Sequence, residues 1–286
     1  MDGPTIVLAA LLTALSVAAW TAIARRWRKG LPSLPLTPRR PAPWKGIDVL
    51  FVALVYLLSH VACQFLVAMW MPGLSGGGTD SAEQFTAALA IGMVASLLAC
   101  GFAVVWLSIR AQVTAEDLGW RSDYPLADVR LGLVAFAAVA APVYGLQAFL
   151  SQFVEEQHPI IEILQKHPSP LLYLLGGLSA VVVAPIAEEF FFRALLQGWL
   201  ETLLSPFEMP LSEAGTLEHR PWPGAIVVAS LMFAALHLGQ GAAPIPLFFL
   251  SLALGYLYQR THRLVPCITL HFCINACSFA LLCFSR

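Results

Sequence analysis

Residues 171–193 read LLYLLGGLSAVVVAPIAEEFFFR, an apolar run that ends in two glutamates and an arginine. A membrane-spanning helix needs about 20 apolar residues, so this run is long enough to form one. A charge at the centre of such a helix costs roughly 2.5–3.5 kcal/mol, and Glu188, Glu189 and Arg193 would together cost on the order of 8–10 kcal/mol if unpaired. The cluster must therefore be paired, hydrated or functional, and we expect the function to lie there.

The composition of the chain indicates an integral membrane protein. Of its 286 residues, 58% are hydrophobic and only 12% are charged, whereas soluble domains carry about 25% charged residues. We therefore expect membrane lipid to surround the protein, and we expect no nucleic acid as a partner.

Eight apolar segments are candidates for helices that cross the membrane. They lie near residues 4–24, 47–71, 85–108, 131–150, 170–200, 223–239, 244–258 and 264–284. The sixth and seventh are joined by a segment rich in glycine and proline, and could instead form a re-entrant pair. The sequence predicts an all-α polytopic membrane protein with about eight helices that enclose a polar site. It forms one membrane domain over residues 1–286, whose catalytic core covers about 170–284.

The basic residues predict how the chain is oriented, because loops on the inner side of a membrane carry an excess of lysine and arginine. With the N-terminus outside, the inner loops are 25–46, 109–130, 201–222 and 259–263, and they hold 13 of the 16 basic residues. We expect a multi-pass protein of the cell (inner) membrane with its N-terminus outside.

Few polar residues interrupt the later helices, and their spacing is regular. They are Glu188, Glu189, Arg193, His237, His271 and Asn275. Residues four apart lie on one face of a helix, about 5–6 Å apart. Glu189 can therefore pair with Arg193, and His271 can act beside Asn275. Glu188 lies about 100° round the helix from Glu189, so it is the carboxylate left for chemistry.

Two schemes for hydrolysis fit one carboxylate and two histidines. Glu188, His237 and His271 could bind zinc and leave a fourth position for water. Without metal, Glu188 and His237 could deprotonate a water molecule while His271 and Asn275 donate hydrogen bonds to a developing oxyanion. Asparagine is a poor zinc ligand and a good oxyanion donor, which favours the second scheme.

Two other classes of function remain open for these residues. The chain could be a non-catalytic membrane scaffold, or a bacteriocin-immunity protein of the same fold. Membrane glutamates and histidines also mark transporters and proton relays, but the polar groups here gather at one place. Among the remaining histidines, we expect His60 to be a packing residue. The loop histidines His158, His167, His219 and His262 are expected to face solvent.

Three motifs together resemble the CPBP family, which comprises the type II CAAX prenyl proteases and their bacterial Abi or bacteriocin-processing relatives. The motifs are Glu188-Glu189-x-x-x-Arg193, Phe233-x-x-x-His237 and His271-x-x-x-Asn275. The resemblance implies an eight-helix intramembrane endopeptidase that acts near the cytoplasmic face on membrane-associated proteins or peptides, such as prenylated CAAX tails.

The resemblance also implies a role for each motif residue. Glu188 and His237 would activate water, Glu189 and Arg193 would support the site, and His271 and Asn275 would bind the oxyanion. The family is often labelled metalloprotease, and a zinc ion would take Glu188, His237 and His271 as ligands.

The depths of these residues conflict if every helix is straight and just spans the bilayer. Counted from residue 170, Glu188 lies about 27 Å from the outer face, and counted from residue 223, His237 lies about 21 Å from the inner face. These depths differ by roughly 18 Å across ~30 Å of hydrocarbon. The fifth helix must therefore be long and tilted, with Pro185 as a candidate kink, or the sixth must begin outside the bilayer.

Overall fold

The computed structural model describes residues 3–37, 41–70, 82–154, 164, 166, 168–204 and 222–284. Within these ranges the chain forms eight helical rods and no strand. Seven rods are single helices: α1 (Gly3–Arg28), α2 (Gly46–Trp70), α4 (Ala82–Ala111), α5 (Pro125–Leu150), α10 (Gly224–Ala235), α11 (Pro244–Thr261) and α12 (Leu264–Phe284). The eighth, which we call the long rod, runs through α7 (Pro170–Gly177), the π-helical segment η1 (Leu178–Val183), α8 (Ala184–Glu189), the π-helical segment η2 (Phe190–Gln197) and α9 (Gly198–Leu204).

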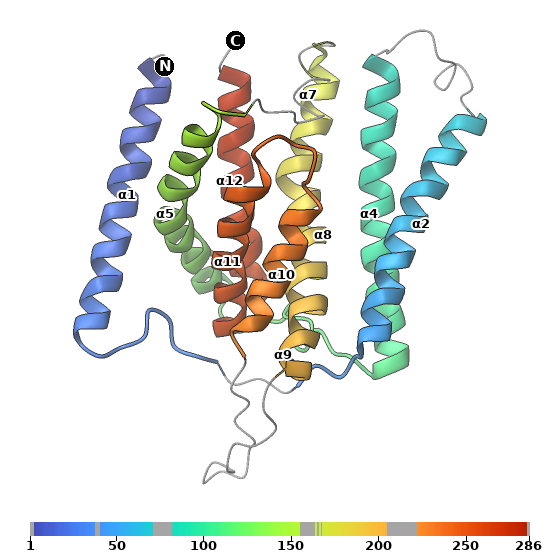
Figure 1. Cartoon of the computed structure of the whole chain (residues 1–286). Helices are drawn as coiled ribbons and strands as arrows, with labels where there is room; N and C mark the ends of the chain where they lie inside the picture. The colour runs from blue at the N-terminus through green and yellow to red at the C-terminus, as the bar shows by residue number, and fades with distance from the viewer. Residues whose placement is uncertain are drawn as a thin grey trace.

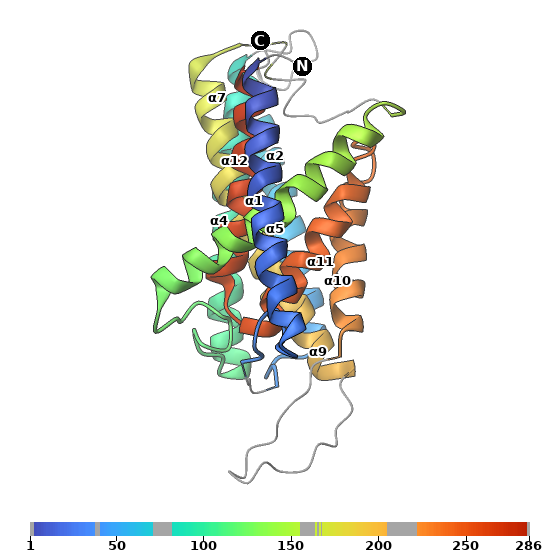
Figure 2. The ribbon, with the colours of Figure 1, turned by 90° about the vertical axis from the view of Figure 1, so that its left-hand side faces the viewer.

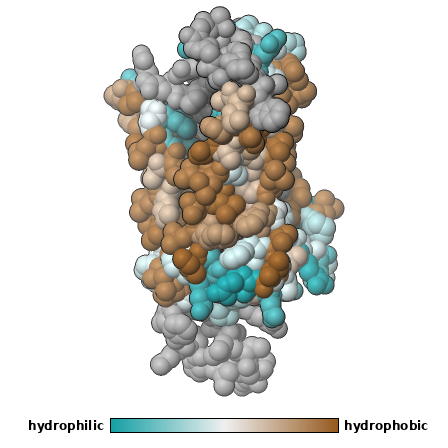
Figure 3. Space-filling view, turned by 90° about the vertical axis from the view of Figure 1, so that its right-hand side faces the viewer, coloured by the Kyte–Doolittle hydropathy of each residue, from teal (hydrophilic) through white to brown (hydrophobic). Residues whose placement is uncertain are grey.

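Six of the rods are long and apolar enough to cross a membrane, which confirms the predicted all-α polytopic fold. One face of the molecule carries a broad apolar band with hydrophilic residues below it (Figure 3). The sixth predicted helix is shorter than expected, because α10 has 12 residues and is about 18 Å long. That length does not cross ~30 Å of hydrocarbon, and His237 lies in the turn after the helix.

The rods stand side by side, with the long rod and α12 in the middle (Figure 1). Helix α1 lies at one edge, and α2 with α4 lies at the opposite edge. Both chain termini lie at one end of the bundle, and α9 lies at the other, which we call the α9 end (Figures 1 and 2). Helices α1, α4 and α11 also finish there, and each has arginine in its last turn. Arg39, Arg40 and Arg220, which the sequence places on the same side, fall outside the described residues.

The length of the long rod removes the conflict between the predicted depths. It contains 35 residues and is about 50 Å long, so it extends well beyond the apolar core of a bilayer. Glu188 precedes the end of the rod at Leu204 by 16 residues, and His237 follows the start of α10 at Gly224 by 13. These counts place the two residues roughly 24 and 20 Å from the α9 end.

Helix α5 crosses α12 at a glycine. A Cβ atom on Gly132 would lie 2.5 Å from the Thr269 Cβ and 2.6 Å from the Pro266 carbonyl oxygen. Small residues let helix backbones approach closely in this way. Because α12 carries His271 and Asn275, this crossing also positions part of the site.

Gly132→Ala is therefore expected to destabilise the protein by about 1–3 kcal/mol, the usual cost of overpacking. Thermal unfolding of the purified protein in detergent measures the effect. Gly145→Ala on the same helix is the matched control, since a Cβ there meets no atom within 4 Å. Equal melting temperatures for the two variants would contradict a tight crossing.

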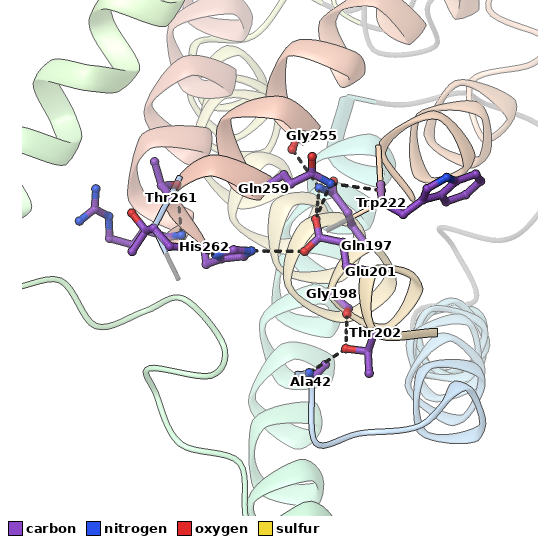
Figure 4. A network of polar contacts seen from close by, with 12 residues as sticks. Ala42, Gln197, Gly198, Glu201, Thr202, Trp222, Gly255, Gln259, Thr261 and His262 are labelled. Carbon is purple, nitrogen blue, oxygen red and sulfur yellow. Dashed lines mark hydrogen bonds and ion pairs between the residues drawn. The ribbon is translucent and has the colours of Figure 1, made fainter. Parts of the chain in front are cut away.

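A buried polar network joins the helices at the α9 end (Figure 4). The Glu201 carboxylate accepts hydrogen bonds from the Gln197 and Gln259 amides at 2.8 and 3.3 Å. His262 lies 3.3 Å from the same carboxylate and is 9% exposed, so the prediction that it faces solvent is wrong. It sits between α11 and α12 with a positive φ of 50°. His158, His167 and His219 lie outside the described residues.

The segment between α1 and α2 is fastened to this end of the bundle. The Ala42 N–H donates to the Thr202 hydroxyl at 2.8 Å, and the Trp44 indole donates to the Leu195 carbonyl at 2.9 Å. Trp44 is fully buried. These contacts hold the segment against η2 and α9, the part of the long rod that follows the two glutamates.

Candidate active site

Three charged or titratable side chains form a buried chain of contacts in the middle of the bundle. The Arg193 Nε donates to the Glu189 Oε2 at 3.0 Å, and the His271 Nδ1 lies 2.9 Å from the Glu189 Oε1. Glu189 and Arg193 are fully buried and His271 is nearly so. The predicted Glu189–Arg193 pair is confirmed, and the structure adds His271 as a second partner of Glu189.

The Arg193 guanidinium has two further neighbours that sequence reasoning missed. It donates to the Ser251 hydroxyl of α11 at 2.8 Å, and it lies over the Phe233 ring of α10, 5.5 Å from the centroid. Phe233, which precedes His237 by four residues, therefore also contacts Arg193. The only signal for Ser251 was a small hydroxyl residue in an apolar helix, which is common in membrane proteins.

Glu188 differs from Glu189 in its surroundings. Its side chain is 30% exposed, and its Oε2 lies 3.7 Å from the His271 Nε2. That separation is longer than a hydrogen bond. Glu188 is therefore the carboxylate of the cluster that is both accessible and not fixed by a cation, as its position on the helix predicted.

His237 comes from the turn after α10 and approaches Glu188 closely enough to interact with its charge. Its Nδ1 lies 2.9 Å from the Phe233 carbonyl oxygen. A carbonyl only accepts hydrogen bonds, so Nδ1 carries the proton and Nε2 is left as an acceptor in the neutral ring. His237 can therefore accept a hydrogen bond from a water molecule near Glu188.

His271 is held between the two glutamates. Its Nδ1 faces the Glu189 carboxylate, so this nitrogen carries a proton and donates. Its Nε2 faces Glu188, and it also becomes a donor when the ring is an imidazolium. Glu189 orients the ring and stabilises that charged form, as a carboxylate does behind other active-site histidines.

Asn275 lies one turn after His271, and its side-chain amide donates to the Ala180 carbonyl of η1 at 2.8 Å. The structure thus joins α12 to the long rod at two places, His271–Glu189 and Asn275–Ala180. An amide nitrogen carries two hydrogens, and the second is not used in this contact. The predicted oxyanion role of Asn275 stays a prediction.

The zinc scheme needs three ligands that converge on one point. Among the described residues, no three histidine, cysteine, aspartate or glutamate side chains lie close enough together to hold a metal ion. Glu188, His237 and His271 therefore do not fit a metal in this arrangement.

All six predicted site residues come from three neighbouring parts of the fold. The long rod carries Glu188, Glu189 and Arg193, the turn after α10 carries His237, and α12 carries His271 and Asn275. Two π-helical segments flank the glutamates. Such segments are rare and frequently occur at functional sites. Residue spacing alone does not reveal them.

Comparison with known proteins gave one match to a family model. Residues 170–277 match the family model described as type II CAAX prenyl endopeptidase Rce1-like. Neither the curated proteins nor the solved structures compared with the chain gave a match. The matched segment begins at the long rod and ends two residues after Asn275, so it includes every predicted site residue. Over this segment, which is less than half of the chain, the protein is similar to the type II CAAX prenyl endopeptidases of the Rce1-like family.

Proposed function

We propose that the protein is an intramembrane endopeptidase that hydrolyses a peptide bond of a membrane-associated protein or peptide of the prenylated CAAX type. The observation that carries the proposal is the contrast between the two glutamates. Glu189 is neutralised by Arg193 and bonded to His271, whereas Glu188 is open and has no cation at hydrogen-bond distance among the described residues. A carboxylate kept free at such a cost in a membrane helix is suited to act as a general base.

In the proposed reaction Glu188 and His237 bind and activate a water molecule. Glu188 takes a proton from the water as the oxygen attacks the scissile carbonyl carbon. His271, as an imidazolium supported by Glu189, donates from Nε2 to the developing oxyanion, and the second amide hydrogen of Asn275 is available to the same atom. When the C–N bond breaks, the proton held by Glu188 passes to the leaving amine.

The proposed orientation places the site on the cytoplasmic side of a cell membrane. Helices α1, α4 and α11 end at the α9 end with arginine in their last turns, and basic residues favour the inner side. Glu188 and His237 lie roughly 20–24 Å from that end. Protease accessibility of tags placed at the N-terminus, in intact cells, measures which side it occupies.

The substrate class is tested with the purified protein and paired peptides. We expect it to cleave a farnesylated CAAX peptide, and to cleave the same peptide without the lipid more slowly, because the lipid brings the peptide to the membrane site. Mass spectrometry identifies the bond that breaks. A protein that cleaves neither peptide, nor any member of a membrane-peptide library, would instead support the scaffold or immunity function.

A further inference from the structure

The Ala180 carbonyl in η1 lacks both of the backbone donors that a helix normally offers it. In an α-helix the Ala184 N–H would bond to this oxygen, but here it donates to the Ser179 carbonyl instead. In the π pattern the donor would be the next residue, which is Pro185, and proline has no N–H. The Ala180 carbonyl instead accepts from the Asn275 side chain at 2.8 Å.

An unpaired carbonyl is costly within a membrane-spanning segment, since no water is present to bond to it. Asn275 removes that cost, and in doing so it ties η1 to α12. Pro185 lies in the first turn of α8, and Glu188 follows it by three residues. The contact therefore sits eight residues, or about two helical turns, before the reactive carboxylate. It lies on the segment that sets the rotation of Glu188 about the helix axis.

We propose that Asn275 is a positioning residue, which acts with Pro185 through the Ala180 carbonyl to orient Glu188. Pro185 removes a backbone donor and Asn275 replaces it from another helix. This role goes beyond oxyanion binding, and its effect on catalysis rests on the proposed peptidase function. A geometric misplacement of a catalytic group can lower a rate by roughly 100-fold.

The proposal predicts that the two residues compensate for each other. Asn275→Leu removes the side-chain donor and should lower kcat roughly 10- to 100-fold per folded molecule, with KM little changed. Pro185→Ala restores a backbone N–H that can reach Ala180. In the Pro185→Ala background, Asn275→Leu should therefore lose much less kcat and much less thermal stability, which a double-mutant cycle measures.

A readout independent of peptidase activity follows the position of Glu188 directly. A hydrophobic carbodiimide modifies carboxyl groups in membrane segments, and mass spectrometry gives its rate of reaction with Glu188. We expect Asn275→Leu to change this rate and Pro185→Ala to restore it. If the wild type cleaves no substrate, the proposed function fails while the labelling and melting data still decide this inference.

Pro142→Ala is the matched control, because Pro142 also lies inside a membrane helix, α5, and its side chain is exposed. In the Asn275→Leu variant, Pro142→Ala should restore neither kcat, nor thermal stability, nor the labelling rate of Glu188. Where Asn275→Leu does not fold, Asn275→Ala removes the same donor without added bulk. The proposal is overturned if Asn275→Leu changes kcat and Glu188 labelling equally in both backgrounds. If Asn275 acted only as an oxyanion donor, Asn275→Leu would lower kcat equally in both backgrounds and would leave the labelling of Glu188 unchanged.

Discussion

Glu188→Gln is expected to lower kcat for peptide cleavage by a factor of about 10² to 10⁴, which is the usual contribution of a general base. Glutamine has nearly the same shape as glutamate but cannot take a proton from water. The Glu188 side chain is partly exposed, and its contact with His271 is too long for a hydrogen bond. The folded structure should therefore tolerate the change, and the melting temperature should stay close to that of the wild type.

The matched control for this variant is Glu83→Gln. Glu83 lies in the first turn of α4 and is exposed, far along the chain from the cluster. Its replacement should change neither kcat nor stability. Rates are compared per folded molecule, measured by size-exclusion chromatography and thermal unfolding. If Glu188→Gln cleaves as fast as the wild type, Glu188 is not the base.

Arg193→Leu is expected to destabilise the protein by about 3–5 kcal/mol, because it leaves a buried carboxylate without its cation. Glu189 has no exposed surface, and after the change His271 would be its one remaining ion-pair partner among the described residues. The Ser251 hydroxyl and the Phe233 ring would also lose a partner. Unfolding in detergent, followed by circular dichroism, measures the loss.

A double variant separates the charge effect from the loss of packing. Replacing both partners, Glu189→Leu with Arg193→Leu, removes the unpaired charge and should cost less than Arg193→Leu alone. Arg193→Lys keeps the charge but not the planar guanidinium, and should lie between the wild type and Arg193→Leu. A single Arg193→Leu variant as stable as the wild type would show that the ion pair contributes nothing to the fold.

The helices and their approximate positions could be predicted from sequence because their length and apolar character are local properties. The run at residues 171–193 required a membrane helix, and the spacing of Glu189 and Arg193 required a pair on one face. A long fifth helix was one of the two arrangements that would let Glu188 and His237 meet at one depth. Each of these inferences depends on one segment, or on the sum of helix lengths.

The features of the site that could not be predicted depend on contacts between segments that are distant in the sequence. His271 lies 82 residues after Glu189, and no spacing rule relates their side chains. The π segments arise where the long rod meets donors from other elements, the Asn275 amide at Ala180 and the Trp44 indole at Leu195. His262 was misplaced for the same reason, because its partner Glu201 lies 61 residues earlier and is itself bonded to Gln259 of α11.

The central claim is that Glu188 activates water for peptide hydrolysis in the membrane. Its most direct test is cleavage of a farnesylated CAAX peptide in ¹⁸O-labelled water by the wild type and by Glu188→Gln, with mass spectrometry of the products. The wild type should release a fragment with one ¹⁸O atom in its new carboxyl group, and Glu188→Gln should release almost none. Equal amounts of labelled fragment from both proteins would contradict the claim.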